Sequence, residues 1–203
     1  MTNLVKMHEH EFHTILVTGV PGVGKSSIVN RIQEKYDVEC LNFGDVLFDL
    51  VQEKKLEGIE HVDQMRQKLD INTCHQLQLE VAGRLNEKRN GHLVVTSHLS
   101  ISTPNGFMPG FPESIIDVLG PCLIVLVEAP AEEIRARRQA DKSDRVRGGD
   151  LETNIDFQQQ LNRSLAASYA YKTSQFTLPI ANKQGKLKDA FAQLEKTLDQ
   201  YFK

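Results

Sequence analysis

Short, nearly continuous apolar runs recur along the chain, and they lack the period-two alternation of strands that are exposed on one face. Runs of this kind, rich in Val, Ile and Leu, are typical of parallel strands that are buried on both faces of a sheet. The runs that we predict to be strands span residues 14–19, 38–43, 92–97, 122–129 and 175–181.

The segments between these runs have helical spacing. In residues 25–36, for example, Ile28, Ile32 and Tyr36 fall on one face. The predicted helices span residues 25–36, 72–89, 130–140, 150–172 and 185–202. Strand and helix alternate throughout, which predicts an α/β fold: a doubly wound five-stranded parallel sheet with helices on both faces. Ligands bind such sheets at the carboxyl ends of the strands.

Composition narrows the class of protein. The 203 residues contain no repeat and no linker-like stretch, so we expect a single domain over 1–203. The net charge of −3 gives no reason to expect nucleic acid as a partner. No apolar run approaches the roughly 20 residues of a membrane span, and the first residues lack a secretory apolar core. With only Cys40, Cys74 and Cys122, a disulfide framework is not expected, and we predict a cytoplasmic protein.

The first predicted strand runs into the sequence G-V-P-G-V-G-K-S, which fits the phosphate-loop pattern G-x-x-x-x-G-K-[ST]. Glycines let backbone N–H groups turn toward an anion, and the helix that follows points its positive end at the same place. Lys25 is expected to reach the β- and γ-phosphates, and Ser26 to place its hydroxyl on Mg²⁺ as the metal ligand. The predicted ATP-binding residues of this segment are Gly19, Val20, Pro21, Gly22, Val23, Gly24, Lys25, Ser26 and Ser27.

A phosphate loop alone does not choose between a switch GTPase, an ATPase and a kinase of small molecules. A GTPase would need an N-K-x-D element to read guanine. The nearest match, residues 182–185, has Gly185 in place of the aspartate. The sequence therefore disfavours a guanine switch.

Further motifs follow in a fixed order. They read "TGVPGVGKSS", "LNFGDVLF", "DQMRQKL", "SHLSISTPNGFMPGFP", "EAPAEEIRARRQAD" and "ANKQGKL". From about residue 14 to the end, the chain resembles the archaeal-type adenylate kinases. The resemblance implies reversible, Mg²⁺-dependent transfer of the γ-phosphoryl group of ATP to AMP, giving two ADP, by a homotrimer. A kinase for another nucleoside monophosphate, or a P-loop ATPase or GTPase without an acceptor, remains the alternative.

The resemblance places the monophosphate-binding region at about 43–90. Gly44 would allow close approach of the nucleotide, and Phe43 could stack on its base. Asp45 has the character of a helix N-cap, and a direct role at the nucleotide remains the alternative. Arg66 matches the family's AMP-side arginine and would pair with the α-phosphate. From the residues alone, His98 would be a loop histidine without a role. The predicted AMP-binding residues are Phe43, Gly44, Arg66, Arg84, His98 and Thr103.

A short lid is expected at about 139–152, with Arg145 and Arg147 before the pair Gly148-Gly149. Arg137 and Arg138 match the family's "RR" pair. The resemblance implies that Arg137 and Asn182 lie on the ATP side. The residues it implies to be catalytic are Lys25, Arg138, Arg145 and Arg147.

The chain departs from the family at the end of the third strand. Many members have an aspartate there that steadies Mg²⁺ through water, whereas this chain has Thr96. Asp45 or Glu128 would compensate, or Mg²⁺ would be held by the phosphates, Ser26 and water alone.

Overall fold

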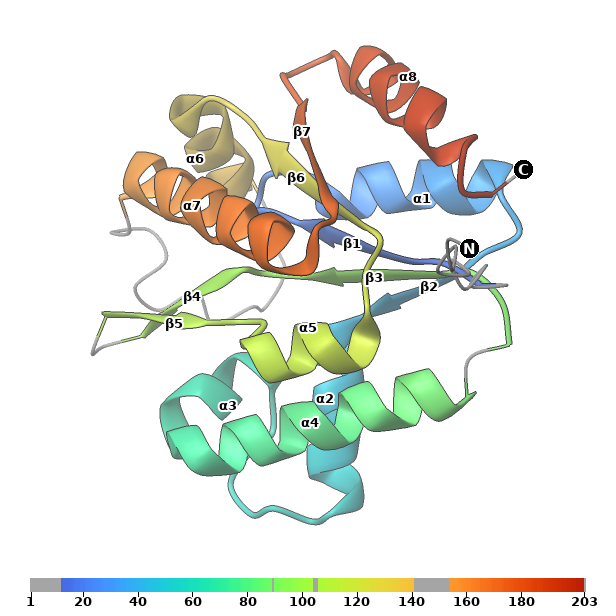
Figure 1. The fold of residues 1–203 in the computed structure, drawn as a ribbon. Helices are drawn as coiled ribbons and strands as arrows, with labels where there is room; N and C mark the ends of the chain where they lie inside the picture. The colour runs from blue at the N-terminus through green and yellow to red at the C-terminus, as the bar shows by residue number, and fades with distance from the viewer. Residues whose placement is uncertain (1–11, 89, 104–105, 141–153, 203) are drawn as a thin grey trace, which may run out of the picture.

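The computed structural model describes residues 12–88, 90–103, 106–140 and 154–202. Five parallel strands form one sheet in the order β2-β3-β1-β6-β7 (Figure 1). The strands are β1 (Thr14–Thr18), β2 (Glu39–Asn42), β3 (Leu93–Ser97), β6 (Leu123–Glu128) and β7 (Phe176–Ala181). All five predicted strands are therefore confirmed, as is their parallel arrangement.

Helices fill most of the connections between these strands. Their bounds are α1 (Lys25–Lys35), α2 (Phe43–Glu53), α3 (Val62–Lys68), α4 (Ile71–Lys88), α5 (Glu113–Leu119), α6 (Ala131–Ala140), α7 (Ile155–Thr173) and α8 (Leu187–Leu198). The five helices predicted from periodicity correspond to α1, α4, α6, α7 and α8, and α2 is the helix that the cap-like residues after the second predicted strand imply. The two seven-residue helices α3 and α5 were not predicted, because so short a segment contains too few turns for a periodic apolar face to stand out.

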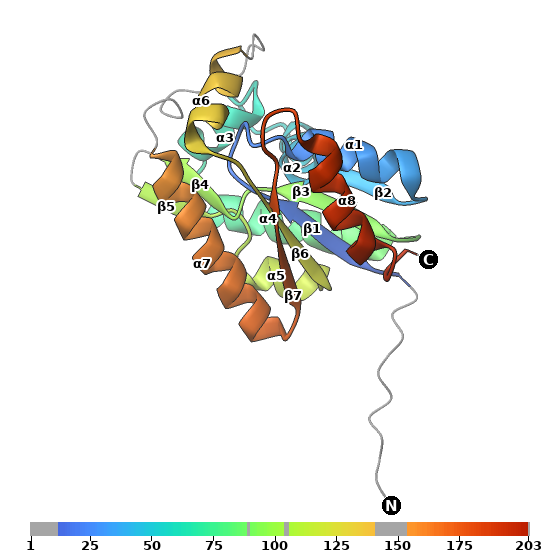
Figure 2. The ribbon, with the colours of Figure 1, turned by 90° about the horizontal axis from the view of Figure 1, so that it is seen from above.

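The helices divide between the two faces of the sheet, as the doubly wound arrangement requires. Ile15 and Val17 of β1 point into a core shared with α1, α6 and α8, while Leu16 points into a core shared with α2, α4, α5 and α7. Viewed from above, α7 and α8 lie on opposite sides of β6 and β7 (Figure 2). Because both faces are covered, the strands are buried on both sides, and this explains their unbroken apolar runs. No helix in the described parts of the chain is long and apolar enough to cross a membrane.

The segment after β3 forms a β-hairpin rather than an open loop. Strands β4 (Ser100–Thr103) and β5 (Gly106–Pro109) pair antiparallel, with Thr103 opposite Gly106. The Thr103 hydroxyl donates to the Gly106 carbonyl at 2.8 Å and so links the end of β4 to the start of β5. The hairpin extends from the carboxyl end of β3, where ligands of such a sheet bind (Figure 1).

One helix start differs from the prediction. The N-cap of α2 is Asn42, whose side chain accepts a hydrogen bond from the Gly44 N–H at 3.0 Å, so the predicted cap role of Asp45 is wrong. Asp45 lies inside the first turn instead. Its negative charge still interacts favourably with the helix dipole there.

Helix α4 is capped by the residue that precedes it. One oxygen of Asp70 accepts hydrogen bonds from the N–H groups of Asn72 and Thr73, at 2.9 and 3.0 Å, and the other accepts one from the Thr73 hydroxyl at 2.5 Å. These bonds, with that from the Thr73 hydroxyl first, lower the pKa of Asp70 below its ordinary value. The cap therefore stabilises the fold when the carboxyl is ionised.

We predict that Asp70→Ala lowers the thermal midpoint at pH 7 by about 2 to 4 °C, the usual effect of losing an N-cap in a domain of this size. Because the folded-state pKa is lowered, the contribution of the carboxylate is present above the unfolded pKa of about 4 and is lost as the pH falls through the folded pKa. The gap between wild type and Asp70→Ala should therefore shrink toward pH 3. Asp70→Asn, a neutral cap, is the control and should remain close to wild type at pH 7. Equal midpoints for wild type and Asp70→Ala at pH 7 would contradict the prediction.

Candidate active site

The glycine-rich segment connects the carboxyl end of β1 to the start of α1. Gly24 occupies the N-cap position of α1 in the left-handed conformation, with φ 96°, and Lys25 is the first helical residue. The first turn of α1 has neither a side-chain cap nor an acidic residue. The unsatisfied N–H groups and the positive end of the dipole are thus directed at the loop, as an anion site requires.

Two glycines of the loop lie in tight contact with other parts of the chain. A Cβ on Gly19 would lie 2.4 Å from the Val127 carbonyl oxygen, and one on Gly24 would lie 2.3 Å from Nδ2 of Asn182. Both glycines also have positive φ values, 151° and 96°. The loop can therefore take this course only with glycine at these positions.

Lys25 folds back onto its own loop. Its ammonium donates to the Gly19 carbonyl at 3.0 Å and lies 3.4 Å from the Val20 carbonyl. A lysine ammonium on a flexible stem can exchange such carbonyls for phosphate oxygens. The prediction that Lys25 acts at the phosphates fits this position.

The predicted ATP-side residues Arg137 and Asn182 meet at the carbonyl of Val23. Nδ2 of Asn182 donates to it at 2.9 Å, and Nη1 of Arg137 at 3.1 Å. Nη2 of Arg137 also donates to the Asn182 carbonyl at 2.9 Å and pairs with Glu133 at 3.0 Å. Glu133 is a site residue that was not predicted, although it lies four residues before Arg137 on α6, a spacing that favours an ion pair.

Arg138 lies against the same loop. Its side chain is almost wholly buried, and its Nε donates to the Pro21 carbonyl at 2.9 Å. The other two predicted catalytic arginines, Arg145 and Arg147, lie outside the described residues. Of the predicted lid, only residues 139–140 are described.

The predicted acceptor-side residues do not gather in one place. His98 lies at the phosphate loop, with Nδ1 2.8 Å from the Gly19 carbonyl. Phe43 is a core side chain, 2% exposed, and its ring centre lies 4.8 Å from that of Phe111, so its position gives no support to base stacking. Gly44 contributes its N–H to the start of α2. Arg66 lies in α3, and its side chain is outside the described part of the structure.

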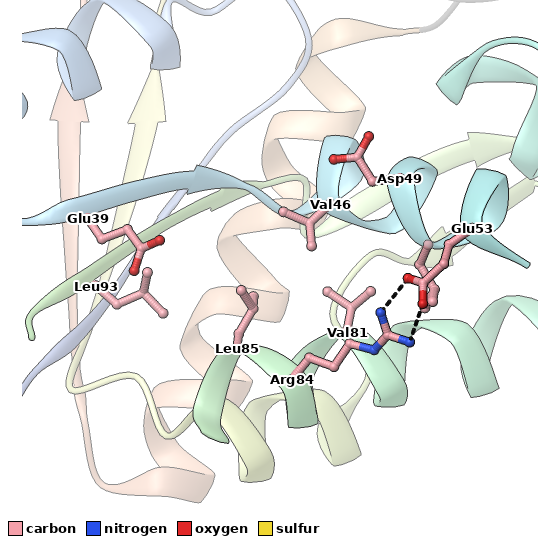
Figure 3. A pocket seen from close by; sticks show the side chains of 9 residues that line it. Glu39, Val46, Asp49, Glu53, Val81, Arg84, Leu85 and Leu93 are labelled. Atoms are coloured by element: carbon pink, nitrogen blue, oxygen red, sulfur yellow. Dashed lines mark hydrogen bonds and ion pairs between the residues drawn. The ribbon is translucent and has the colours of Figure 1, made fainter. Parts of the chain in front are cut away.

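Arg84 is also separate from the loop. Its guanidinium pairs with Glu53 at 2.6 Å and with Glu80 at 2.8 Å, and the pair with Glu53 is the main cause that raises the pKa of Arg84. It lines a cavity of about 220 Å³ between α2 and α4, which Glu39 also lines (Figure 3). Glu39 begins β2, so the cavity reaches the amino end of that strand, opposite the edge where the phosphate loop lies. An AMP-binding role for Arg84 stays a prediction.

The donor set near the loop fits a magnesium ion that is held mainly by nucleotide phosphates. Ser26 is exposed and offers a hydroxyl oxygen, a ligand type that Mg²⁺ accepts. Thr96 donates its hydroxyl to the Leu41 carbonyl at 3.2 Å, and Glu128 is paired with Arg163 at 2.6 Å. Within the described ranges, no group of three or more His, Cys, Asp or Glu side chains could hold a metal ion. The described part of the chain thus offers Mg²⁺ few ligands, which is usual where phosphates provide the rest.

The central strand of a five-stranded parallel sheet is followed by a glycine-rich phosphate loop and by a helix whose first residue is a lysine. This arrangement defines a P-loop nucleotide-binding protein. A family model described as an AAA domain matches residues 18–156. The chain is 38% identical over 189 residues to the curated adenylate kinase of Thermococcus kodakarensis, covering 91% of this chain and 94% of that one. It is 34% identical to the adenylate kinase of Methanothermobacter thermautotrophicus, covering 91% of this chain and 98% of that one. The chain belongs to these P-loop proteins and, among them, to the adenylate kinase family of nucleoside monophosphate kinases.

Solved structures agree on the fold. A shikimate kinase from Bacteroides thetaiotaomicron superposes with a TM-score of 0.63 at 14% identity, covering 92% of this chain and 98% of that one. A sugar kinase from Janibacter superposes with a TM-score of 0.53 at 15% identity, covering 93% of this chain and 95% of that one. At such low identity these similarities confirm the P-loop kinase fold alone.

The fit of the loop leads to a prediction about Gly24. In Gly24→Ala the new Cβ meets Nδ2 of Asn182 at 2.3 Å in a backbone conformation that alanine rarely adopts. We expect ATP affinity, measured by isothermal titration calorimetry, to fall about 5- to 150-fold, because strain of this kind costs on the order of 1–3 kcal/mol. Gly91→Ala is the matched control: a Cβ there meets nothing within 4 Å, and ATP affinity should not change. Wild-type affinity in Gly24→Ala would show that the loop accepts a side chain.

Proposed function

We propose that this chain is an adenylate kinase that transfers the γ-phosphoryl group of MgATP reversibly to AMP, giving two ADP. The observation that carries the proposal is the placement of Lys25 at the first position of α1, directly after the loop that fits an anion. The family of the chain adds the acceptor: the curated relatives named above are adenylate kinases.

On the donor side, the chain's own groups bind and neutralise the phosphates. The loop N–H groups and the start of α1 receive the β- and γ-phosphates, and the Lys25 ammonium moves onto them from the loop carbonyls. Arg138 holds a buried positive charge against the same loop. Arg145 and Arg147 of the lid segment would complete the neutralisation of the transferring group. Charge placed in advance in this way is the main catalytic contribution in phosphoryl transfer.

Ser26 is the proposed protein ligand of Mg²⁺. When bound, the ion neutralises charge on the phosphates and helps to orient them. Thr96 supplies no negative charge, and the Glu128 carboxylate is engaged with Arg163. Of the two carboxylates that could compensate, Asp45 is therefore the better candidate.

On the acceptor side, Arg66 is the proposed partner of the AMP phosphate, with Gly44 and Thr103 at the neighbouring helix start and hairpin. No general base is needed, because the phosphate of AMP is already an anionic nucleophile. Arg137 and Asn182 would border the adenine of ATP, since both are fixed beside Val23 at the end of the phosphate loop. We also propose a cytoplasmic location, which fits the absence of any disulfide among the described cysteines.

A coupled assay with MgATP, offering AMP, CMP, UMP, GMP and dTMP in turn, tests the reaction. We expect ADP formation that requires AMP, that stops when EDTA removes Mg²⁺, and that falls at least about a hundredfold in Lys25→Ala, which loses its phosphate-binding charge. Lys183→Ala, which removes an exposed lysine after β7, is the control and should retain activity. Preference for another monophosphate would change the acceptor, and phosphate release without any acceptor would make the protein an ATPase.

The family resemblance also leads us to propose a homotrimer. A trimer of the 22.9 kDa chain has a mass of about three times that value, and sedimentation equilibrium would measure it directly. We expect the trimer mass at micromolar protein. A monomer mass at that concentration would contradict the proposal without affecting the proposed reaction.

A further inference from the structure

Two side chains share the carbonyl of Gly19. Nζ of Lys25 lies 3.0 Å from this oxygen and Nδ1 of His98 lies 2.8 Å from it, while the two nitrogens are 3.3 Å apart. A carbonyl oxygen can only accept a hydrogen bond, and the contact of Nδ1 with this oxygen is shorter than its contact with Lys25, so we assign the ring proton to Nδ1. With this tautomer Lys25 does not donate to Nδ1. The contact between the nitrogens is that of two donors on one acceptor, and His98 holds the carbonyl independently of Lys25.

The two donors differ in what nucleotide binding requires of them. Lys25 must leave the loop carbonyls when its ammonium moves onto the phosphates. If Lys25 were the only donor, the Gly19 carbonyl would lose its hydrogen bond at that moment, and the loss would count against binding. His98 has no such second task in the proposed reaction, so its hydrogen bond persists through the exchange.

The backbone on both sides of this hydrogen bond is held firmly. A Cβ on Gly19 would lie 2.4 Å from the Val127 carbonyl oxygen, so the loop cannot shift toward β6. On the other side, the Gly110 backbone packs so closely that a Cβ there would lie 1.9 Å from the His98 carbonyl oxygen. The Gly110 N–H also donates to the Leu99 carbonyl at 2.9 Å. The base of the β4–β5 hairpin thus fixes His98 against the loop.

We propose that His98 is a positioning residue for the phosphate loop: its Nδ1–H holds the Gly19 carbonyl so that Lys25 can transfer to the phosphates of the donor nucleotide. The proposal deepens the proposed function and rests on it. It differs from the role that the sequence predicted, in which His98 lines the AMP site. The two roles have different kinetic consequences, since one affects the donor nucleotide and the other the acceptor.

The test compares His98→Leu with His98→Asn by calorimetry with MgATP alone and by steady-state kinetics with ATP and AMP. In His98→Leu we expect the Kd and KM for ATP to rise about tenfold, the loss expected for one unsatisfied carbonyl. Because Lys25 is on the phosphates in both the bound ground state and the transition state, kcat should change less than about threefold, and the KM for AMP less than about twofold.

The conservative variant should rescue binding. The side-chain N–H of asparagine can occupy nearly the place of Nδ1–H, so His98→Asn should remain within about threefold of wild type for ATP. In His98→Gln the amide lies one bond farther out and should not rescue. If His98→Leu fails to fold, the Asn and Gln pair carries the same test. His75→Asn is the matched control, because His75 is half-buried with one hydrogen bond to Ser114 at 2.7 Å, away from the loop, and its kinetics should not change.

Two outcomes would overturn the proposal. A rise in the KM for AMP with unchanged ATP affinity would assign His98 to the acceptor site. Equal losses in the Asn and Gln variants would show that the position of the N–H donor does not matter. Failure of the proposed function is seen separately, because the wild-type protein would then hydrolyse ATP without requiring AMP. The effect of His98→Leu on ATP binding would still support the positioning role in that case.

Discussion

The site depends on how the carbonyl groups of the phosphate loop are satisfied. Three alternate carbonyls each accept hydrogen bonds from distant side chains: Gly19 from His98, Pro21 from Arg138, and Val23 from both Arg137 and Asn182. A peptide group whose C=O is tied to the protein points its N–H the other way. The loop therefore presents N–H groups to its open side, and this is the arrangement that binds phosphate.

The doubly wound sheet makes this possible. His98 follows β3, the two arginines lie on the helix that follows β6, and Asn182 follows β7. In a parallel sheet all of these points lie at the same edge, around the carboxyl end of β1 where the loop begins. Residues separated by as many as 159 positions in the sequence thus meet at one carbonyl, and the same burial that forms the sheet also fixes the loop.

The parts predicted correctly from the sequence are those that depend on local pattern. The five strands and five of the helices follow from apolar runs and periodicity, and the phosphate loop from the fixed spacing of its glycines and Lys25. What could not be predicted depends on competition between neighbours. Asn42 and Asp45 are both good caps, and only the backbone geometry decides that Asn42 takes the Gly44 N–H. From the sequence alone, Arg84 could equally be an AMP-binding residue or an ion-pair partner, because only the folded position of α2 shows that Glu53 lies beside it.

His98 illustrates the same limit more sharply. Its place in a loop after β3 indicates the ligand edge of the sheet, but both nucleotides bind at that edge, and sequence has no signal for which one a side chain faces. The choice is made by the tight packing of Gly110 against the His98 backbone and by the reach of Nδ1 to Gly19. Such close backbone contacts arise from tertiary packing, so a motif can identify the residue without giving its contact.

The positive charges around the loop divide into fixed and movable groups. Arg137 and Arg138 are held by hydrogen bonds to loop carbonyls, and Arg138 is buried, so both hold their charge in place before any nucleotide arrives. Lys25, by contrast, is bound to carbonyls that it can exchange. Glu128 would oppose a phosphate from the end of β6, but its pair with Arg163 offsets that charge. The fixed charges lower the energy of a polyanion without reorganising. Of these three cationic side chains only Lys25 has to move on binding, and this is why the second donor on the Gly19 carbonyl matters.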